Sequence, residues 1–437
     1  MRITVIGCGY LGAVHAACMA ELGHEVLGID VDQAKIDLLA AGRAPFYEPG
    51  LPELLTSANA TGRLRFTTDM SEAAGYDAHF IAVGTPQKKG EYAADLTYVD
   101  AAVASLAPHL APGNVVIGKS TVPVGTARRL AGIVAAAQPE AVLAWNPEFL
   151  REGFAVEDTL RPDRLVYGVP DGAAGEHAKA VLDEIYATAL GNETPLVVTG
   201  YETAELVKVS ANAFLATKIS FINAIAEVAD VTGADVTAIA DAIGYDARIG
   251  RRFLNAGLGF GGGCLPKDIR AFQARAGELG ADQALTFLRE VDAINMRRRS
   301  RAVDLTRELL DDSLLGKKVA VLGLAFKPES DDVRDSPALD VASQLRSQGA
   351  RVVAYDPEAV PNAQRLHPEL DFASSAEEAA ADADAVVLLT EWKQFRALDP
   401  EAFGRVVGNR NILDGRNCLS PEEWRAAGWR YRALGRP

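Results

Sequence analysis

The sequence predicts an α/β protein with two Rossmann-like, doubly wound domains joined by a long central helix. Short apolar runs rich in Val and Ile alternate with helical stretches in the first third of the chain, and again after Leu315. This alternation is typical of parallel sheets covered by helices on both faces. Between these regions, residues 203–230 contain neither Gly nor Pro. We therefore expect domains at residues 1–200 and 301–437, with a helical region at 201–300.

The first domain is expected to contain five strands of one sheet. Apolar runs of strand length occupy residues 3–6, 25–29, 78–83, 115–118 and 142–145, and helical pattern covers residues 11–22. Buried parallel strands have such continuous apolar runs because helices cover both of their faces.

In the central region, apolar residues recur at helical spacing, which predicts one long, heavily buried helix. These residues are Leu206, Val209, Phe214, Ile219, Ile222 and Ile225. More helical pattern follows at residues 236–243 and 268–307. A long apolar helix between two α/β domains is also a suitable seam between subunits, so we expect a homodimer.

The bulk composition argues against several classes of protein. The 437 residues are 49% hydrophobic and carry a net charge of -15, whereas a nucleic-acid-binding protein needs a basic face. The four cysteines, Cys8, Cys18, Cys264 and Cys418, lack the spacing of a metal site or a disulfide framework, so we expect no metal and a reduced, cytoplasmic protein. Neither a signal peptide nor an apolar run long enough to span a membrane is expected.

A glycine turn follows the first strand and opens the first helix. Gly7, Gly9 and Gly12 fit the spacing G-x-G-x-x-G, which lets the backbone approach a pyrophosphate at a helix N-terminus. Asp30 ends the second strand, where a carboxylate accepts hydrogen bonds from ribose hydroxyls and repels a 2′-phosphate. The pattern predicts an NAD site, and the alternative is a turn that only joins strand to helix.

The most informative stretch is the glycine-rich segment that leads to Cys264. Residues 257–263 contain five glycines, which exclude a stable helix or strand and indicate a loop. Pro266 suits the first turn of a following helix. A thiol just before a helix N-terminus and beside Lys267 favours the nucleophilic thiolate, with Asp268 at the same helix end. The alternative is a small, buried structural cysteine.

Three further segments carry polar residues at positions suited to a site. Lys208 and Asn212 are four residues apart on the long helix and share a face; the alternative for Lys208 is a side chain whose head reaches solvent. The segments 119–126 and 146–153 follow expected strands, where doubly wound sheets place their ligands. In the second of these, Glu148 and Glu152 have the spacing to face the same way, although a capping or surface role is the alternative.

The last third repeats the alternation of strands and helices seen in the first, with strands expected at residues 318–323, 351–355 and 385–389. Residues 349–356 parallel residues 23–30, but the glycine fingerprint is replaced by Gly323-Leu-Ala-Phe-Lys. This domain is therefore expected to bind something other than a second dinucleotide. Lys327, Arg334 and Arg416 supply cations on its loops, and for each the alternative is a solvated surface charge.

Together these motifs resemble the UDP-glucose 6-dehydrogenases of the UDP-glucose/GDP-mannose dehydrogenase family. The resemblance covers residue 1 to about residue 420, in the order of the family. Gly263 departs from the family, which commonly has Ser there, and this should loosen the loop slightly. The motifs are residues 7–12, 83–86, 119–126, 146–153, 208–212, 248–250, 260–268, 326–327, 334 and 414–416.

The resemblance implies roles for individual residues. It implies that NAD is bound by Gly7, Gly9, Tyr10, Leu11, Gly12, Asp30, Lys35, Thr85, Thr121, Glu152, Lys267 and Arg334. It implies that the UDP-sugar is bound by Glu148, Phe149, Leu150, Arg151, Glu152, Lys208, Asn212, Phe253, Leu254, Asn255, Ala256, Gly257, Gly261, Phe326, Lys327 and Arg416. Arg248 is implied to reach the substrate of the partner subunit across a dimer interface.

The resemblance also implies a four-electron oxidation of UDP-glucose to UDP-glucuronate. Asp268, Lys208 and a water held by Thr121 would remove the hydroxyl proton. Cys264 would hold a thiohemiacetal and then a thioester, with Lys208 and Asn212 stabilising the oxyanion and Glu148 assisting hydrolysis.

Three other activities remain open at this point. The first is oxidation of another nucleotide-sugar, such as GDP-mannose or a UDP-N-acetylhexosamine. The second is a two-electron 3-hydroxyacid dehydrogenase, whose superfamily also keeps a Lys-x-x-x-Asn pair but has no use for Cys264. The third is a non-catalytic NAD-sensing domain, which leaves the Lys208–Asn212 pair and the glycine loop unexplained.

Overall fold

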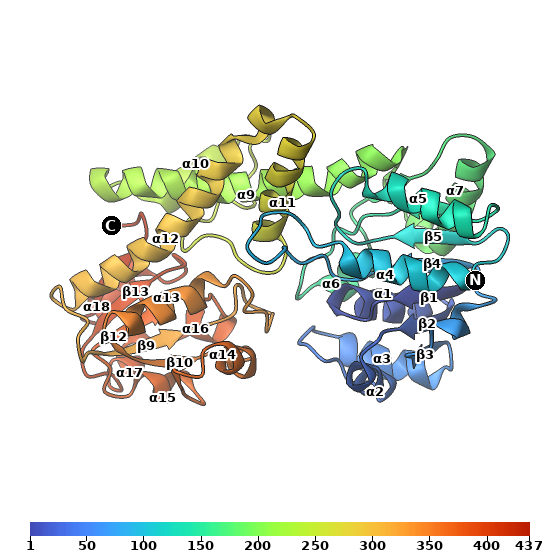
Figure 1. Ribbon diagram of the computed structural model, residues 1–437. Coiled ribbons are helices and arrows are strands. Elements are labelled where there is room, and N and C mark those ends of the chain that lie inside the picture. The colour runs from blue at the N-terminus through green and yellow to red at the C-terminus, as the bar shows by residue number, and fades with distance from the viewer. The chain divides into compact units, whose positions relative to one another are not determined.

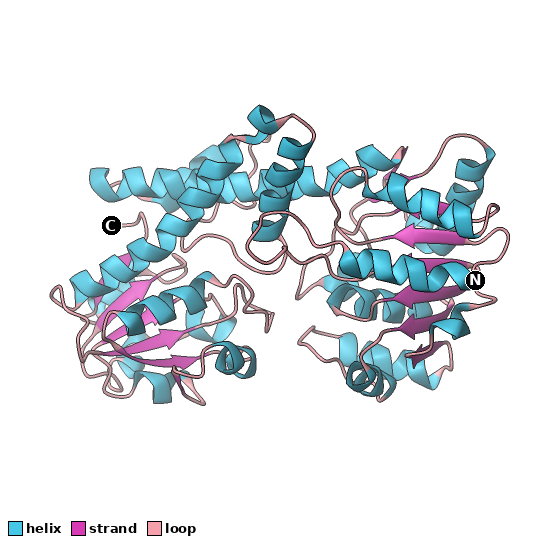
Figure 2. Ribbon diagram, viewed as in Figure 1, coloured by secondary structure: helices cyan, strands magenta, loops and turns pink.

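The computed structural model describes all 437 residues and divides into two compact units. Unit 1 contains Met1–Ala211 with Arg270–Gly280, and unit 2 contains Asn212–Ile269 with Ala281–Pro437. Each unit has its own sheet with helices around it (Figure 1, Figure 2). The predicted class, two Rossmann-like domains and a long central helix, is confirmed, while the domain boundaries at residues 200 and 300 stay a prediction.

The sheet of unit 1 has eight strands in the order β3-β2-β1-β4-β5-β6-β7-β8. All neighbours are parallel except β6 and β7, which are antiparallel. The strands are β1 (Arg2–Ile6), β2 (Glu25–Ile29), β3 (Leu64–Thr67), β4 (Ala78–Ile81), β5 (Val115–Gly118), β6 (Val142–Trp145), β7 (Leu165–Gly168) and β8 (Leu196–Thr199).

Helices bury apolar residues against both faces of this sheet. One core contains residues of α1 (Tyr10–Glu21), α3 (Leu51–Ala60) and α7 (Ala173–Ile185). The other core contains residues of α4 (Thr97–Leu106) and α5 (Thr126–Ala137), with the first turn of α9. The shorter helices of the unit are α2 (Gln33–Ala40), α6 (Ala155–Leu160) and α8 (Ala187–Gly191). The carboxyl ends of β1, β4, β5 and β6 lead into the loops that carry the predicted site residues.

The sheet of unit 2 is parallel throughout, in the order β11-β10-β9-β12-β13-β14. Its strands are β9 (Lys318–Leu322), β10 (Arg351–Tyr355), β11 (Asp371–Phe372), β12 (Ala385–Leu388), β13 (Asn411–Asp414) and β14 (Arg430–Ala433). Helix α12 (Phe287–Leu309) packs beside α13 (Pro337–Ser347) and the sheet (Figure 1). Smaller helices complete the unit: α10 (Val236–Gly244), α14 (Val360–Leu366), α15 (Ala376–Ala380), α16 (Lys393–Arg396), α17 (Pro400–Phe403) and α18 (Pro421–Ala426).

The central helix α9 runs from Tyr201 to Thr232 without interruption. Its predicted heavy burial was only partly right, because Val209 and Ile222 are buried whereas Phe214 is 66% exposed. By length and composition α9 is also apolar enough to cross a membrane, so the prediction that no segment could do so was wrong. This is weak evidence of a membrane span, since core helices of globular proteins pass the same test.

The helical pattern expected over residues 268–307 is interrupted. Helix α11 (Leu265–Glu278) ends before Gly280, which has a φ of +76°, a backbone conformation that favours glycine. A short 3₁₀ turn at Asp282–Leu285 precedes α12. The chain therefore forms two helices where the periodicity predicted one.

Candidate active site

The glycine turn after β1 has the backbone that a dinucleotide requires. Gly7 has a φ of +91°, and a Cβ there would lie 2.6 Å from Cγ1 of Val83. A Cβ on Gly12 would lie 1.7 Å from the carbonyl oxygen of Gly7. By contrast, apart from Gly9 itself and its two chain neighbours, no protein atom lies within 4 Å of the Cβ position of Gly9, which caps α1 without a side-chain bond. Backbone N–H groups at this helix end are thus available for a pyrophosphate.

Asp30 is held in place at the end of β2. Its Oδ2 accepts a hydrogen bond of 2.7 Å from the backbone N–H of Cys8 and forms an ion pair of 2.8 Å with Nζ of Lys35. The structure therefore brings together the glycine turn and two residues predicted to bind the cofactor. The pyrophosphate of NAD is bound by a Gly-rich turn, and its adenosine ribose by an acidic residue at a strand end, so these residues fit NAD.

Two threonines predicted to bind the cofactor are joined by a hydrogen bond in the loops that follow β4 and β5. The hydroxyl of Thr85 donates a 2.7 Å hydrogen bond to the carbonyl of Thr121, and the Ser120 hydroxyl donates one of 2.6 Å to the carbonyl of Val83. Beyond them, the buried carboxylate of Glu205 accepts from the N–H groups of Gly125 and Ala127, both at 2.7 Å. Burial raises the pKa of Glu205 to about 7.

Glu48 joins the glycine turn to the loop after β6, although no motif in the sequence marks it. Its carboxylate accepts hydrogen bonds of 2.7 Å from the N–H groups of Gly153 and Ala155, and another from the hydroxyl of Tyr10. Glu48 is buried. It thereby fixes the backbone beside Glu152 against the turn that contains Tyr10.

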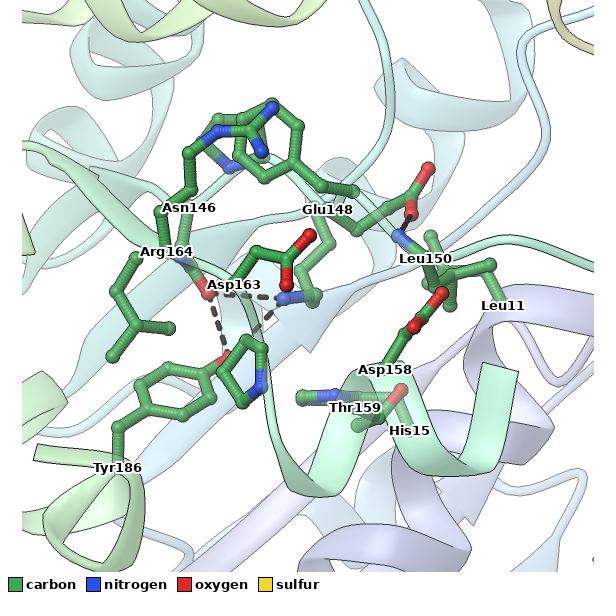
Figure 3. A pocket seen from close by; sticks show the side chains of 15 residues that line it. Leu11, His15, Asn146, Glu148, Leu150, Asp158, Thr159, Asp163, Arg164 and Tyr186 are labelled. Atoms are coloured by element: carbon green, nitrogen blue, oxygen red, sulfur yellow. Dashed lines mark hydrogen bonds between the residues drawn. The ribbon is translucent and has the colours of Figure 1, made fainter. Parts of the chain in front are cut away.

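Lys208 and Glu148 form a buried ion pair within unit 1. Nζ of Lys208 lies 3.2 Å from Oε1 of Glu148, and the two side chains are 7% and 12% exposed. The same Nζ lies 5.5 Å from the ring centre of Phe149. The alternative of a lysine reaching solvent is therefore wrong. Glu148 also accepts a 2.7 Å hydrogen bond from the N–H of Leu150 (Figure 3).

The segment that carries Glu148 is a loop and not a helix. The expectation that Glu148 and Glu152 face the same way assumed helical geometry and has no basis in this backbone. In this loop Arg151 is paired with Asp158, and the guanidinium of Arg164 lies 3.8 Å from the ring centre of Phe149.

In unit 2, Cys264 lies immediately before α11, as predicted, and it is exposed. The alternative of a buried structural cysteine applies to Cys8 and Cys18 and is wrong for Cys264. The backbone N–H of Asp268 donates a 3.0 Å hydrogen bond to the carbonyl of Cys264. Pro266 lies in the first turn of the helix.

The buried carboxylate of Asp268 bonds to two other predicted site residues. Oδ2 accepts a 2.6 Å hydrogen bond from the amide of Asn212, and Oδ1 pairs with Lys267 at 2.6 Å. One carboxylate thus links α9 to the helix that follows the candidate nucleophile. Along the chain, Lys208 precedes Asn212 by four residues on α9.

The glycine loop before Cys264 is packed against the C-terminal part of unit 2. A Cβ would lie 2.4 Å from the Asp335 carbonyl at Gly261, 2.8 Å from the Phe326 ring at Gly262, and 2.3 Å from the Arg334 guanidinium at Gly263. Arg334 therefore occupies the side of the loop into which a side chain at Gly263 would project, while the expected loosening of the loop stays a prediction. Asn295, which no motif in the sequence marks, fixes the backbone of Phe260, because its side-chain amide accepts from the N–H of Phe260 and donates to its carbonyl.

The three cations predicted on unit 2 differ in their surroundings. Arg416 is nearly buried and donates to the backbone carbonyls of Gly259, Phe326 and Leu389, so the surface-charge alternative is wrong for it. Lys327 lies 5.5 Å from the ring centre of Phe326. Arg334 is largely exposed and paired with Asp332.

The loop between α10 and the glycine segment carries the other predicted substrate contacts. Phe253 has a φ of +67°, and Leu254 and Ala256 are buried in a small core with α9 and α10. Asn255 accepts a hydrogen bond from Arg251, and Gly257 donates its N–H to Asn223. Arg248, which is 89% exposed, pairs only with the neighbouring Asp246 in the described contacts.

Comparison with protein families covers most of the chain. The NAD binding domain, central domain and UDP binding domain of the UDP-glucose/GDP-mannose dehydrogenase family match residues 1–190, 202–297 and 320–421. The chain belongs to this family. It is accordingly an NAD-dependent oxidoreductase, and the prediction that NAD is its cofactor is confirmed.

Individual members of the family match over their full length. The chain is 45% identical to the UDP-glucose 6-dehydrogenase of Rhizobium meliloti (strain 1021), covering 100% of both chains. A UDP-glucose dehydrogenase structure from Pyrobaculum islandicum superimposes with a TM-score of 0.91 at 39% identity, covering 100% of this chain and 98% of that one. A UDP-D-ManNAc dehydrogenase from Pyrococcus horikoshii has a TM-score of 0.87 at 28% identity, covering 100% and 99%.

Proposed function

We propose that this chain oxidises UDP-glucose to UDP-glucuronate in a four-electron reaction in which Cys264 carries the intermediates. The observation that carries the proposal is the exposed Cys264 at the start of α11, one turn before the Asp268 carboxylate that binds Asn212 and Lys267. A thiol at a helix N-terminus is favoured as thiolate, and a two-electron dehydrogenase has no use for it. NAD supplies the hydride acceptor in both oxidations.

In the first oxidation, the chain must remove the proton of the C6 hydroxyl. We assign this proton to a base system of Asp268, Lys208 and a water held by Thr121. Lys208 is suited to this because its ammonium is buried and lies 3.2 Å from the carboxylate of Glu148, which holds it in place. The products of this step are an aldehyde and one NADH.

The Cys264 thiolate then adds to the aldehyde carbon, which gives a thiohemiacetal and keeps the aldehyde from escaping. Loss of the second hydride from the carbon, together with loss of the hydroxyl proton, converts the thiohemiacetal to a thioester. Water adds to the thioester carbonyl carbon with Glu148 taking its proton, and the carbon–sulfur bond breaks so that Cys264 leaves as thiolate. The balance is one UDP-glucose, one water and two NAD converted to UDP-glucuronate, two NADH and three protons.

Oxyanions arise at the substrate oxygen in the addition and hydrolysis steps. We assign their stabilisation to the Lys208 ammonium and the Asn212 amide, which are four residues apart on α9. One N–H of the Asn212 amide is directed to Asp268, which fixes the orientation of the other. Preorganised donors of this kind stabilise charge without reorganisation at the moment of reaction.

The remaining predicted site residues are proposed to bind the substrate or the cofactor. The UDP-sugar is assigned to the loop around Glu148, the segment from Phe253 to Gly257, and Gly261, Phe326, Lys327 and Arg416. The cofactor is assigned to the glycine turn, Asp30, Lys35, Thr85, Thr121, Glu152, Lys267 and Arg334. The burial of Arg416 against the carbonyl of Gly259 supports a second role, which is to hold the glycine loop in place.

We also propose a homodimer formed through α9. Phe214, Phe221 and Val228 are spaced by seven residues and are each more than half exposed, so they form one apolar stripe on this helix. Arg248 would reach the substrate of the partner subunit across this interface. The required Cys264 thiolate suits the reducing cytoplasm, which we propose as the location.

A substrate panel tests the proposed function. The full chain is assayed with NAD and UDP-glucose, GDP-mannose or a UDP-N-acetylhexosamine, and NADH is counted per substrate consumed. We expect UDP-glucose to be preferred with two NADH per molecule, in line with relatives of that name at 45% and 39% identity. Preference for another nucleotide-sugar overturns the substrate, and a single NADH per substrate overturns the four-electron reaction.

A further inference from the structure

A small polar cavity lies beside the loop that carries Glu148, and the chemistry described so far does not use it. Its volume is about 50 Å³, and its lining residues all belong to unit 1 (Figure 3). One ordered water needs about 10–15 Å³ of cavity, so there is room for more than one. The lining includes three buried residues with polar side chains, His15, Lys119 and Tyr186.

His15 of α1 is a buried residue whose polar atoms the fold leaves unbonded. It lines the cavity and is 1% exposed, and neither of its ring nitrogens has a hydrogen-bond partner in the protein. Burial lowers the pKa of His15 well below its usual value, so the ring is neutral, with one N–H donor and one acceptor. Buried polar atoms nearly always have a partner, which is an ordered water where the protein supplies none.

The ammonium of Lys119 has a further donor at the same cavity. Nζ donates to Oδ1 of Asn146 at 3.0 Å and to the hydroxyl of Tyr186 at 3.1 Å. The Tyr186 hydroxyl in turn donates to the same Oδ1 at 2.7 Å (Figure 3). A lysine ammonium has three N–H donors, so one remains for another partner. The lining thus offers water an ammonium donor from Lys119 and ring nitrogens from His15.

Glu148 also lines this cavity (Figure 3). Its Oε1 lies 3.2 Å from Nζ of Lys208, and its Oε2 accepts a 2.7 Å hydrogen bond from the N–H of Leu150. A carboxylate has about four acceptor positions, so capacity remains for a water. The lining also includes Asp163, which is exposed and gives water a route from the surface. The cavity therefore joins an exposed residue to the carboxylate that is assigned to hydrolysis.

We propose that this cavity is a water site, in which ordered water bonds to His15 and Lys119 and supplies the molecule that Glu148 activates. This inference rests on the proposed function, because hydrolysis of the thioester is the step that consumes water. The water oxygen adds to the thioester carbon as its proton passes to Glu148, and the carbon–sulfur bond then breaks with Cys264 leaving as thiolate. His15 and Lys119 bond to the water and not to the substrate, so they are positioning residues.

A variant that fills the cavity tests the site without changing a residue assigned to the chemistry. Thr159 of α6 lines the cavity, and its hydroxyl donates to the carbonyl of Ala155 on the same helix. Thr159→Leu extends this side chain into the cavity and should displace the water. Thr159→Val is the matched control, because it also removes the hydroxyl but has nearly the volume of threonine.

His15 provides a second, independent pair of variants. His15→Phe keeps a ring and removes both nitrogens, whereas His15→Gln keeps one donor and one acceptor. The ring of His15 packs edge-on against that of Phe80 with centroids 4.4 Å apart, and phenylalanine can retain this contact. The pair keeps the inference testable should Thr159→Leu fail to fold. Titration with NAD confirms that each variant still binds the cofactor.

The test combines a crystal structure with transient kinetics. In the wild-type crystal we expect ordered water bonded to His15 and Lys119, and in Thr159→Leu we expect none there. With UDP-glucose and NAD, Thr159→Leu and His15→Phe should form their first two NADH per site at the wild-type rate. Later turnover should be at least about tenfold slower, since general-base catalysis contributes about 10²–10⁴-fold.

Intact-protein mass spectrometry of the quenched reaction identifies the step that is slowed. In Thr159→Leu and His15→Phe the thioester should accumulate on Cys264 after the burst of NADH. Thr159→Val and His15→Gln should turn over like wild type and accumulate no adduct. A structural defect would not produce this pattern, because it would also slow the two hydride transfers.

The outcomes separate the inference from the function on which it rests. In an enzyme that forms two NADH per UDP-glucose, a wild-type cavity without ordered water overturns the inference alone. Wild-type hydrolysis in both Thr159→Leu and His15→Phe does the same. Equal slowing in Thr159→Leu and Thr159→Val overturns it too, because loss of the hydroxyl would then be the cause. Wild-type enzyme that forms no UDP-glucuronate overturns the proposed function instead.

Discussion

The amide of Asn212 donates a 2.6 Å hydrogen bond to the carboxylate of Asp268, one helical turn after Cys264. The same carboxylate pairs with Lys267, and the backbone N–H of Asp268 bonds to the carbonyl of Cys264. These contacts fix the acid, the amide and the backbone of the nucleophile relative to one another. Such fixed geometry is the main requirement for electrostatic stabilisation of an oxyanion.

Replacement of Lys208 by Ala should lower kcat by at least about 100-fold, because it removes an acid–base group that is also an oxyanion donor. It also leaves the Glu148 carboxylate buried without the cation that now lies 3.2 Å away. Steady-state NADH formation measures the effect. Lys179→Ala, on the partly exposed surface of α7, is the control and should keep the wild-type rate. A near-normal rate in Lys208→Ala contradicts the assigned role.

Glu48→Gln should weaken both stability and NAD binding. Glutamine has one acceptor oxygen in place of a carboxylate that accepts from Gly153, Ala155 and Tyr10. A buried donor left without a partner costs about 1–3 kcal/mol, and we expect a loss of that order in the free energy of unfolding. The NAD dissociation constant should rise several-fold, as Tyr10 lies in the glycine turn.

Urea unfolding and titration with NAD measure the two effects of Glu48→Gln. The matched control is Glu53→Gln, on the exposed first turn of α3, which should change neither quantity. Unchanged NAD affinity in a Glu48→Gln enzyme that has lost stability would show that Glu48 does not act on the turn.

Glu205 should make stability depend on pH. Burial raises its pKa to about 7 from the ordinary 4.5, so the folded state holds a proton that the unfolded state has lost between these values. The stability contributed by this group is therefore present below pH 4.5 and is lost as the pH rises toward 7. Glu205→Gln removes this loss, and its stability relative to wild type should increase from pH 5 to pH 7.5.

The measurement for Glu205 is urea unfolding of both proteins at each pH, with the difference between them compared. Glu202→Gln serves as control, because the Arg128 partner lowers the pKa of Glu202 instead. The free energy of unfolding of wild type could instead differ from that of Glu205→Gln by the same amount at every pH. That result would rule out a change in the titration of this carboxylate on folding.

The apolar stripe of α9 should form the subunit interface. A carboxylate at the centre of the stripe, in Phe221→Glu, should convert the dimer to monomer, because the charge would be buried without a partner. Sedimentation velocity at micromolar concentration measures the mass in solution. Val198→Glu, an exposed apolar position on β8, should remain dimeric. A wild-type monomer, or a dimeric Phe221→Glu, would place the interface elsewhere or exclude it.

The sequence predicted the parts of the site that glycine and helix geometry determine locally. The turn at Gly7–Gly12 and the loop before Cys264 need backbone that few other residues allow, and both were placed correctly. Strands of continuous apolar residues such as β2, β5, β6 and β10 were also predicted with their observed bounds. The strands β3, β7, β8, β13 and β14 were missed, and in β3 and β14 arginines interrupt the apolar run on which the prediction of a buried strand depends.

The missed residues act through distant contacts. Glu48 bonds to backbone 105 and 107 residues away, and Asn295 clamps Phe260 from 35 residues away. Lys119 was noticed only as part of a loop, since nothing near it in sequence shows that it is buried. The only local signal at Glu48 is a carboxylate in an otherwise apolar and turn-forming segment, Pro45-Phe-Tyr-Glu-Pro-Gly50.

Mass spectrometry of Cys264 can show whether this thiol carries the substrate covalently. Glu148→Gln enzyme, which lacks the proposed base for hydrolysis, is mixed with UDP-glucose and NAD, quenched in acid and digested. We expect a UDP-glucuronyl adduct on the peptide that contains Cys264, formed with two NADH per site, and no adduct in Cys264→Ala. NADH formation without any adduct on that peptide, or full turnover by Cys264→Ala, would contradict the covalent mechanism.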